Sequence, residues 1–180
     1  MKHFRFFLLL AAFSSLGLHC KKEHDEPKTE LEKLPPITME GKQTFGWLAN
    51  GKAIIGDVSG FLADYEGGKL SFGGKDIPVQ SSLSGNGIGF TTNPGVINST
   101  GMFKIPIKRN IGDWTYFGAG LSFIPYTYSN QFTDHGNATI NIYRLDTINY
   151  YMAGTFAFTV YSQFGDSLVI TDGRFDIKYH

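Results

Sequence analysis

The single cysteine of the chain, Cys20, is the residue whose surroundings most clearly indicate a chemical role. It follows an apolar segment and precedes the charged run Lys21–Glu26. A lone thiol forms no disulfide within the chain, but it can carry acyl groups, and two or more acyl chains give stable attachment to a membrane. We therefore predict that Cys20 is a site of lipid attachment. The alternative is an unmodified thiol within a cleaved leader.

Residues 1–19 have the three-part layout of a secretory signal peptide, with a basic start and an apolar centre. The apolar run, residues 6–18, is shorter than the ~20 residues that a membrane-spanning helix needs. The charged residues after Cys20 end the run abruptly, which favours cleavage over an uncleaved anchor or a buried helix. Gly17 suits a cleavage site, whereas His19 is larger than the residue usual directly before the cut.

The layout around Cys20 resembles the lipobox of bacterial lipoproteins, in which the cysteine becomes the lipidated first residue of the mature chain. The run Lys21–Glu26 is similar to the lysine-and-acid export signal of surface-displayed Bacteroidota lipoproteins. The resemblance implies a cell-envelope protein that is anchored in the outer membrane through lipid. It leaves open which side of that membrane the protein faces.

The charge balance argues against nucleic acid as a partner. The full chain has 16 basic and 16 acidic residues, and loss of Lys2 and Arg5 with the leader leaves 14 basic residues, for a net charge of −2. Such a chain offers neither a basic field for nucleic acid nor a polybasic patch for lipid headgroups. Residues 20–180 suffice for one domain with its own core, and that core depends on no disulfide because no other cysteine is present.

No catalytic, metal or cofactor constellation stands out in the sequence. The pair Asp134-His135 lacks an accompanying Gly-x-Ser-x-Gly elbow, and the glycine-rich stretch 85–89 is followed by no helix that could cradle a phosphate. A glycan hydrolase would need two carboxylates about 5–10 Å apart across a cleft. Candidates such as Asp113, Asp134 and Asp146 are widely separated in the chain. We therefore expect a protein that is not an enzyme.

The mature chain is expected to begin with a tether and to continue as one domain over residues 44–180. Residues 20–43 are charged, contain three prolines and show no sustained apolar period, which predicts a flexible tether. The domain opens with Asn50-Gly51 between two apolar runs, a strong signal for a type I′ hairpin. Pairing across that turn places Phe45, Trp47 and Ile54 on one face, which we expect to be the core face.

Short alternating segments with turn residues between them continue to the end of the chain. Pro106 predicts that the strand over 101–107 lies at a sheet edge, because proline lacks an amide donor. Residues 125–137 are expected to form a long loop, and Asp172-Gly173 to be a turn between two strands. This pattern predicts an all-β fold, most simply an antiparallel β-sandwich, with a closed or partly open β-barrel as the alternative.

Both ends of this domain resemble a group of uncharacterised Bacteroidota lipoproteins, which are small secreted β domains. The resemblance rests on the Asn-Gly-Lys hairpin within 44–52, on residues 153–159, and on the C-terminal stretch Thr-Asp-Gly-Arg-Phe-Asp-Ile-Lys-Tyr, residues 171–179. These are turn and core residues, so the resemblance implies a shared fold. It implies no catalytic or binding role.

Aromatic residues in the second half of the domain are the main candidates for ligand binding. Eight are considered, namely Trp114, Tyr116, Phe117, Tyr126, Tyr128, Phe132, Tyr150 and Tyr151. Of these, Tyr126, Tyr128 and Phe132 fall within the expected loop. Exposed aromatic rings stack on sugars, so these three predict a glycan-binding face, whereas burial of the same rings would indicate a structural role.

Two tripeptides resemble the short Asp-Thr/Ser-aliphatic motif for O-glycosylation of exported Bacteroidota proteins. They place the acceptor hydroxyls on Thr147 and Ser167. The sequence as a whole predicts a lipid-anchored envelope lipoprotein that acts as a non-enzymatic binding or structural module. A glycan-binding surface module and a glycan hydrolase are the alternatives. The expected partners are the membrane, through the lipid, and a glycan or another envelope protein.

Overall fold

The computed structural model describes residues 28–57, 63–76, 87–107, 116–120, 127–129 and 136–180. Within these ranges the chain forms one short helix and eleven antiparallel strands that join in a single sheet. In chain order they are α2 (Glu30–Lys33), β1 (Thr44–Ala49), β2 (Lys52–Asp57), β3 (Ala63–Glu66), β4 (Lys69–Asp76), β5 (Gly87–Thr91), β6 (Gly101–Pro106), β7 (Tyr116–Gly120), β8 (Thr127–Ser129), β9 (Asn137–Asp146), β10 (Tyr151–Tyr161) and β11 (Ser167–Lys178). None of the described helical residues forms a helix long and apolar enough to cross a membrane.

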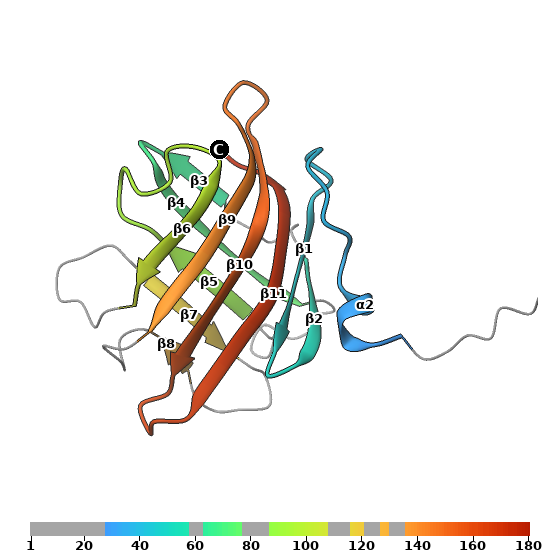
Figure 1. Cartoon of the computed structure of the whole chain (residues 1–180), viewed down its shortest axis with the longest axis vertical. Helices are drawn as coiled ribbons and strands as arrows, with labels where there is room; N and C mark the ends of the chain where they lie inside the picture. Colours follow the sequence, from blue (N-terminus) through green and yellow to red (C-terminus); the bar gives the residue numbers. More distant parts are fainter. Residues whose placement is uncertain (1–27, 58–62, 77–86, 108–115, 121–126, 130–135) are drawn as a thin grey trace, which may run out of the picture.

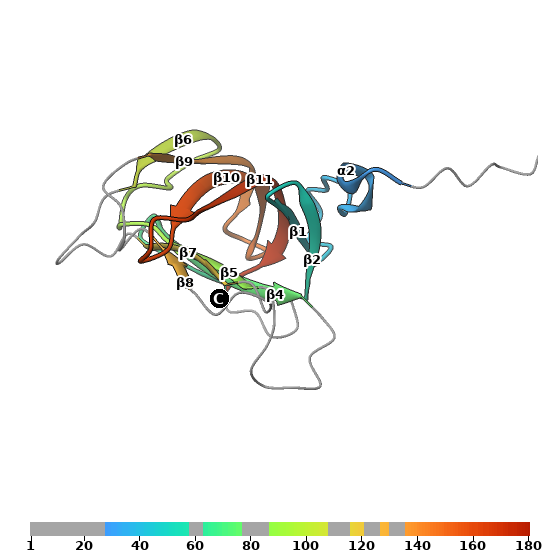
Figure 2. The same ribbon diagram turned by 90° about the horizontal axis from the view of Figure 1, so that it is seen from below.

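The sheet curls into an open half-barrel (Figure 1). Neighbouring strands follow the order β11-β1-β2-β4-β5-β7-β8-β10-β9-β6, while β3 pairs with β4 and β10 also pairs with β11. In Figure 2, β6, β9, β10 and β11 form one layer, β4, β5, β7 and β8 form the facing layer, and β1 and β2 lie along one side. The predicted antiparallel all-β fold is confirmed, and the curled sheet has the shape of its partly open barrel alternative.

Phenylalanine rings fill the space between the two layers. The ring of Phe72 on β4 lies 4.0 Å from that of Phe90 on β5, and Phe90 stacks on Phe117 of β7 at 5.6 Å between ring centroids. From the facing layer, Phe156 lies 5.7 Å from Phe90 and 6.3 Å from Phe175. Because side chains alternate between the two faces of a strand, the neighbours of these phenylalanines along each strand point away from the core.

The first hairpin forms as its sequence predicts. Asn50 and Gly51 have φ angles of 47° and 80°, which is the left-handed pair that a type I′ turn requires. Trp47 pairs with Ile54 across the two strands. Phe45, Trp47 and Ile54 are all buried in the core, so the predicted core face is confirmed.

The last strand differs from its prediction. The expected turn at Asp172-Gly173 is absent, and β11 runs through both residues without a break. Asp172 has a φ of 51°, and the register of β11 shifts at this point against both β1 and β10, so the two residues form a β-bulge. A Cβ on Gly173 would overlap the ring of Phe156, which explains the glycine. Asp-Gly serves a bulge as well as a turn, and pairing with strands on both sides selects the bulge.

Two further expectations concern the strands over residues 101–137. β6 lies at the end of the strand order and pairs with β9, so the edge position predicted from Pro106 is confirmed. The expected loop over residues 125–137 instead contains the short strand β8, which pairs with both β7 and β10. β8 is only three residues long, too short for its alternation to be recognised in the sequence.

The described part of the expected tether, residues 28–43, lies against the β domain. A carboxylate oxygen of Glu30 accepts a hydrogen bond of 2.8 Å from the backbone amide of Ala53 on β2. Leu34 is buried, and the carbonyl of Pro35 accepts a hydrogen bond from Arg174 on β11. The composition of this segment, which is charged and contains prolines, is typical of a flexible tether. The composition does not report the groups on β2 and β11 that bind the segment to the domain.

Candidate functional site

Several residues singled out in the sequence fall outside the described ranges. They are Cys20, Tyr126 and Phe132 among the predicted site residues, and Asp113 and Asp134 among the carboxylates considered for hydrolysis. Their roles stay predictions.

Tyr128 does not face a ligand. Its side chain is 4% exposed and belongs to the hydrophobic core. Tyr128 lies on β8 opposite Ala119 of β7, and strand alternation turns its ring toward the interior. The prediction that Tyr128 is a ligand-facing aromatic is therefore wrong, because a residue expected in a loop lies on a strand.

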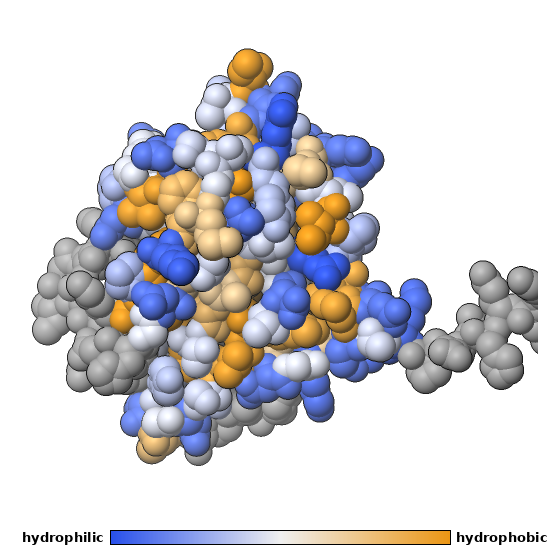
Figure 3. Space-filling model, viewed as in Figure 1, coloured by the Kyte–Doolittle hydropathy of each residue, from blue (hydrophilic) through white to orange (hydrophobic). Residues whose placement is uncertain are grey.

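The two predicted acceptors for sugar, Thr147 and Ser167, are both exposed but differ in their neighbours. Thr147 lies in the β9–β10 hairpin, whose tip carries apolar atoms in Figure 3, and the adjacent Ile148 is 84% exposed. Ser167 begins β11, and the adjacent Leu168 is fully buried in the core. Only the tripeptide at Thr147 presents both its hydroxyl and its aliphatic residue to solvent.

Asp146 shapes the β9–β10 hairpin. Its Oδ1 accepts hydrogen bonds from the backbone amides of Ile148 at 3.1 Å and Asn149 at 2.8 Å. Its Oδ2 accepts one of 3.0 Å from Arg144, and the Asn149 side-chain amide reaches both oxygens. The backbone amide of Asn149, then its side-chain amide and the Arg144 guanidinium, hold the pKa of Asp146 well below its usual range. This carboxylate stays ionised and is poorly suited to donate a proton.

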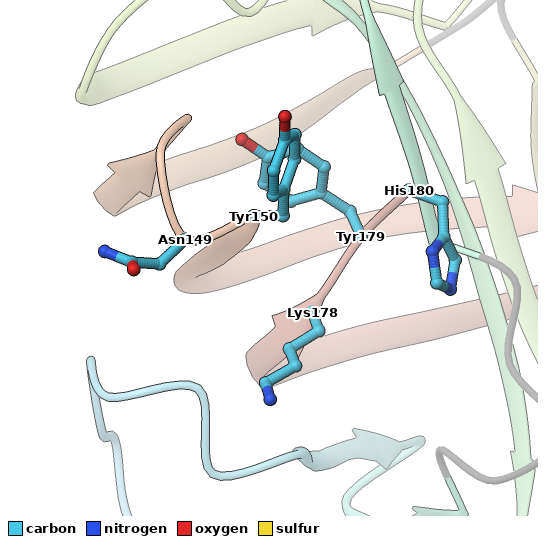
Figure 4. Close-up of a pocket in the computed structure, with 5 residues that line it drawn as sticks. All are labelled: Asn149, Tyr150, Lys178, Tyr179 and His180. Carbon is cyan, nitrogen blue, oxygen red and sulfur yellow. The ribbon is translucent and has the colours of Figure 1, made fainter.

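A pocket of about 410 Å³ lies beside this hairpin, where the end of β11 meets it (Figure 4). It is lined by Asn149, Tyr150, Lys178, Tyr179 and His180. Figure 4 shows the two tyrosine rings close together, with Asn149 and His180 on opposite sides of them. The ring centroids of Tyr150 and Tyr179 lie 6.0 Å apart at an interplanar angle of 77°.

Hydrogen bonds hold both tyrosines in place. The hydroxyl of Tyr179 donates to the backbone carbonyl of Asp146 at 3.0 Å, and the backbone amide of Tyr179 donates to the carbonyl of Tyr150 at 2.9 Å. Tyr179 is buried, which raises its pKa, and packs against Tyr65 at 5.4 Å between ring centroids. Tyr150 by contrast is 58% exposed, so its ring faces solvent while its backbone carbonyl is held by the hydrogen bond from Tyr179.

Tyr150 also has a strained backbone. Its φ is +55°, a left-handed conformation that bulky residues rarely adopt. Such strain persists only where the surroundings impose it, and it concentrates at ligand-binding positions. The hairpin around Tyr150 is held by hydrogen bonds from the amides of Ile148 and Asn149 to Asp146 and from the amide of Tyr179 to the carbonyl of Tyr150.

Comparisons with protein-family models, with curated proteins and with solved structures found no match to this chain. The pocket is therefore interpreted from its own chemistry. Its lining combines two aromatic rings with an amide, an ammonium and an imidazole group, and none of its five residues is an aspartate or a glutamate. Apolar pockets with a few polar groups are typical of sites that bind small molecules.

The described residues contain no group of three His, Cys, Asp or Glu side chains that could hold a metal ion.

The buried carboxylate of Asp176 has its hydrogen-bond partners in the segment before β1. Its Oδ2 accepts hydrogen bonds from Thr38 Oγ1 at 2.6 Å and from the amides of Glu40 and Lys42 at 3.0 and 3.2 Å, and its Oδ1 accepts one of 2.7 Å from the amide of Gly41. Asp176 thus binds residues 38–42 to the last strand.

Sequence reasoning found only part of this pocket. Tyr150 belongs to the eight aromatics considered for ligand binding, but no sequence pattern points to Asn149, Lys178, Tyr179 or His180. The alternation of apolar residues along β11 predicts that Tyr179, directly after this strand, faces the core, and its side chain is buried there. No local signal indicates that its hydroxyl reaches Asp146, 33 residues earlier in the chain.

Proposed function

We propose that this protein is a lipid-anchored envelope lipoprotein whose β domain binds a glycan without converting it, at the pocket beside Tyr150. The observation that carries the proposal is the exposed ring of Tyr150, held in a strained conformation against the buried ring of Tyr179. A binding surface of this kind keeps its aromatic face rigid before the ligand arrives, which lowers the entropy lost on binding.

The chemistry of the pocket supports a sugar as ligand. The C–H face of a sugar ring packs on an exposed aromatic ring, while the hydroxyls of the sugar need donors and acceptors at the rim. Asn149 supplies a side-chain amide whose direction is fixed by its hydrogen bonds to Asp146. A two-carboxylate hydrolytic mechanism uses a pair of Asp or Glu side chains across the bound sugar, and none of the five lining residues is an aspartate or a glutamate.

The anchor and the bound segment support a position close to the membrane. From Cys20 to Lys28, where the described chain begins, eight residues span at most about 28 Å when fully extended. Residues 28–43 lie along the domain and add no further free length. A lipid on Cys20 would therefore hold the β domain close to the membrane surface.

The test is binding of a saccharide panel to residues 20–180, carrying Cys20→Ser to prevent lipidation. We expect at least one saccharide to raise the melting temperature and to give saturable binding by calorimetry. Tyr150→Ala should weaken that binding at least about tenfold, the effect of losing ~1.4 kcal/mol. Tyr143→Ala is the matched control, because Tyr143 is also an exposed tyrosine of the β9–β10 region but does not line the pocket.

Two outcomes would contradict the proposal. One is the absence of any binding across neutral and acidic saccharides. The other is a ligand whose affinity Tyr150→Ala leaves unchanged. Either result would favour a structural role or a protein partner, and capture of envelope proteins by the lipidated chain would then be the next experiment.

A further inference from the structure

Three glycines lie side by side on the outer face of the layer formed by β4, β5 and β7. Gly73 pairs with Gly89 across β4 and β5, and Gly89 pairs with Gly118 across β5 and β7. Each glycine has a phenylalanine on one side along its strand, and these three residues, Phe72, Phe90 and Phe117, are buried in the core. Alternation therefore turns the three glycines away from the core, and Gly73 and Gly89 leave bare backbone on β4 and β5.

Two of these glycines have a structural explanation. A Cβ on Gly118 would overlap the side chain of Tyr116, whose ring lies over this position. A Cβ on Gly73 would lie 3.0 Å from the carbonyl oxygen of Ile88, a tight contact with backbone that cannot easily move.

Gly89 has no such explanation. A Cβ on Gly89 would meet its nearest atoms, the carbonyl oxygen of Phe72 and the Cα of Gly73, at 3.7 and 3.8 Å, which is ordinary van der Waals contact. Its backbone also lies outside the left-handed region that favours glycine. Glycine weakens a strand interior, so a residue with a side chain would be the more stable choice here. The missing side chain leaves space above the strand.

That space is a shallow trough of about 300 Å³. Its floor is the backbone of Gly73 and Gly89, and its sides are Ser71, Thr91 and Tyr116. The hydroxyls of Ser71 and Thr91 share a hydrogen bond of 2.9 Å, so they form a paired polar edge. Tyr116 contributes both a partly exposed ring and a hydroxyl.

We propose that this trough is a binding site for a neutral saccharide ring. Three hydroxyl-bearing side chains, one aromatic ring and a flat floor match the polar edges and apolar faces of a pyranose. The lining holds no lysine, arginine, histidine or carboxylate, which disfavours a charged ligand. The trough shares no residue with the pocket beside Tyr150, so it stands independently of the function proposed for that pocket.

Gly89→Val tests the proposal, because it fills the trough with a residue suited to a strand. The probes are cellohexaose, chitohexaose and mannohexaose, titrated into residues 20–180 carrying Cys20→Ser. We expect at least one of them to bind, with amide NMR shifts at Gly73 and Gly89. Gly89→Val should melt at or above the wild-type temperature and bind that probe at least about tenfold more weakly.

Control variants separate this site from other effects. Ala157→Val introduces the same side chain on the outer face of the facing layer and should leave binding unchanged. Tyr116→Phe keeps the ring over Gly118 and removes one hydroxyl, so it should weaken binding without altering the fold. Tyr150→Ala should leave binding in the trough intact, which distinguishes failure here from failure at the other pocket.

The proposal is overturned if none of the three probes binds, if the shifts map away from Gly73 and Gly89, or if Gly89→Val binds as the wild type does. A Gly89→Val chain that fails to fold would contradict the steric argument, and normal binding by Tyr116→Phe would then remove the remaining support.

Discussion

Thr38 Oγ1 donates a hydrogen bond of 2.6 Å to the carboxylate of Asp176, which joins the segment before β1 to the last strand of the sheet. Asp176 is fully buried beneath that segment and also accepts hydrogen bonds from three of its backbone amides. A single carboxylate thus organises the entry of the chain into the β domain.

Asp176→Asn should lower the free energy of unfolding by ~2 kcal/mol, because the amide nitrogen of asparagine would face hydrogen-bond donors. Hydrogen exchange should also become faster at the amides of Gly41 and Lys42. Urea denaturation and exchange mass spectrometry measure both effects. Asp172→Asn is the control, since Asp172 is an exposed acid on the same strand and should change stability by no more than about 0.5 kcal/mol. Equal stability of the two variants would contradict the role of Asp176.

Acid should weaken the wild type through the same group. Burial pushes the pKa of Asp176 upward, but the hydrogen bonds from Thr38 and from the amides of Glu40, Lys42 and Gly41 outweigh it, so the pKa lies below its usual value. A carboxylate with a lowered pKa in the folded state stabilises the fold above its unfolded pKa of about 3.9 and loses that contribution as the pH falls toward the folded value. We therefore expect wild-type stability to fall below about pH 4 more steeply than that of Asp176→Asn. Parallel curves in this range would contradict the expectation.

The covered face of Asp176 illustrates what sequence reasoning could and could not provide. The alternation of β11 indicates correctly that Phe175, Ile177 and Tyr179 enter the core and that Asp176 points the other way. It does not indicate that residues 38–42 cover that outward face. Local periodicity reports on which side of a strand a residue lies, and the cover comes from a segment more than 130 residues away.

Of the two turns expected at Asn50-Gly51 and Asp172-Gly173, only the first depends on local sequence alone. Asn50-Gly51 was predictable because two residues with positive φ suffice to define a type I′ hairpin. Asp172-Gly173 offers a similar local signal, yet β1 and β10 flank it and continue the strand on both sides. The pocket beside Tyr150 also depends on a long-range contact, in which the end of β11 meets the β9–β10 hairpin.

The hairpin prediction concerns Asp146, which positions Tyr150 without lining the pocket. Asp146→Ala removes the acceptor for two backbone amides and releases the strained conformation of Tyr150. We expect glycan affinity at this pocket to fall about tenfold, together with a lower melting temperature. Thr147→Ala removes an exposed neighbour in the same hairpin and should change neither. An Asp146→Ala variant with unchanged affinity would show that the hairpin geometry does not matter for binding.

The bulge prediction compares two glycines of the sheet. Gly173→Ala places a methyl group against the ring of Phe156 in a packed core, which should cost ~2 kcal/mol of stability. Gly89→Ala adds the same methyl group where the nearest atom is 3.7 Å away and should be neutral or stabilising. Chemical denaturation of both variants measures the difference. Equal effects at the two positions would contradict the steric reading of both sites.

The last prediction concerns the anchor and its modification. Lipid on Cys20 should place the native protein in the membrane fraction, and Cys20→Ala should release it, as fractionation and labelling with a palmitate analogue would measure. The intact mass of the native protein reports at the same time on any sugar. We expect such a sugar on Thr147, whose neighbour Ile148 is exposed, and not on Ser167, whose neighbour Leu168 is buried in the core. Thr147→Ala should then remove the added mass, with Ser167→Ala as the control. A mass that corresponds to lipid alone would exclude the modification, and an unlabelled, released wild type would exclude the anchor.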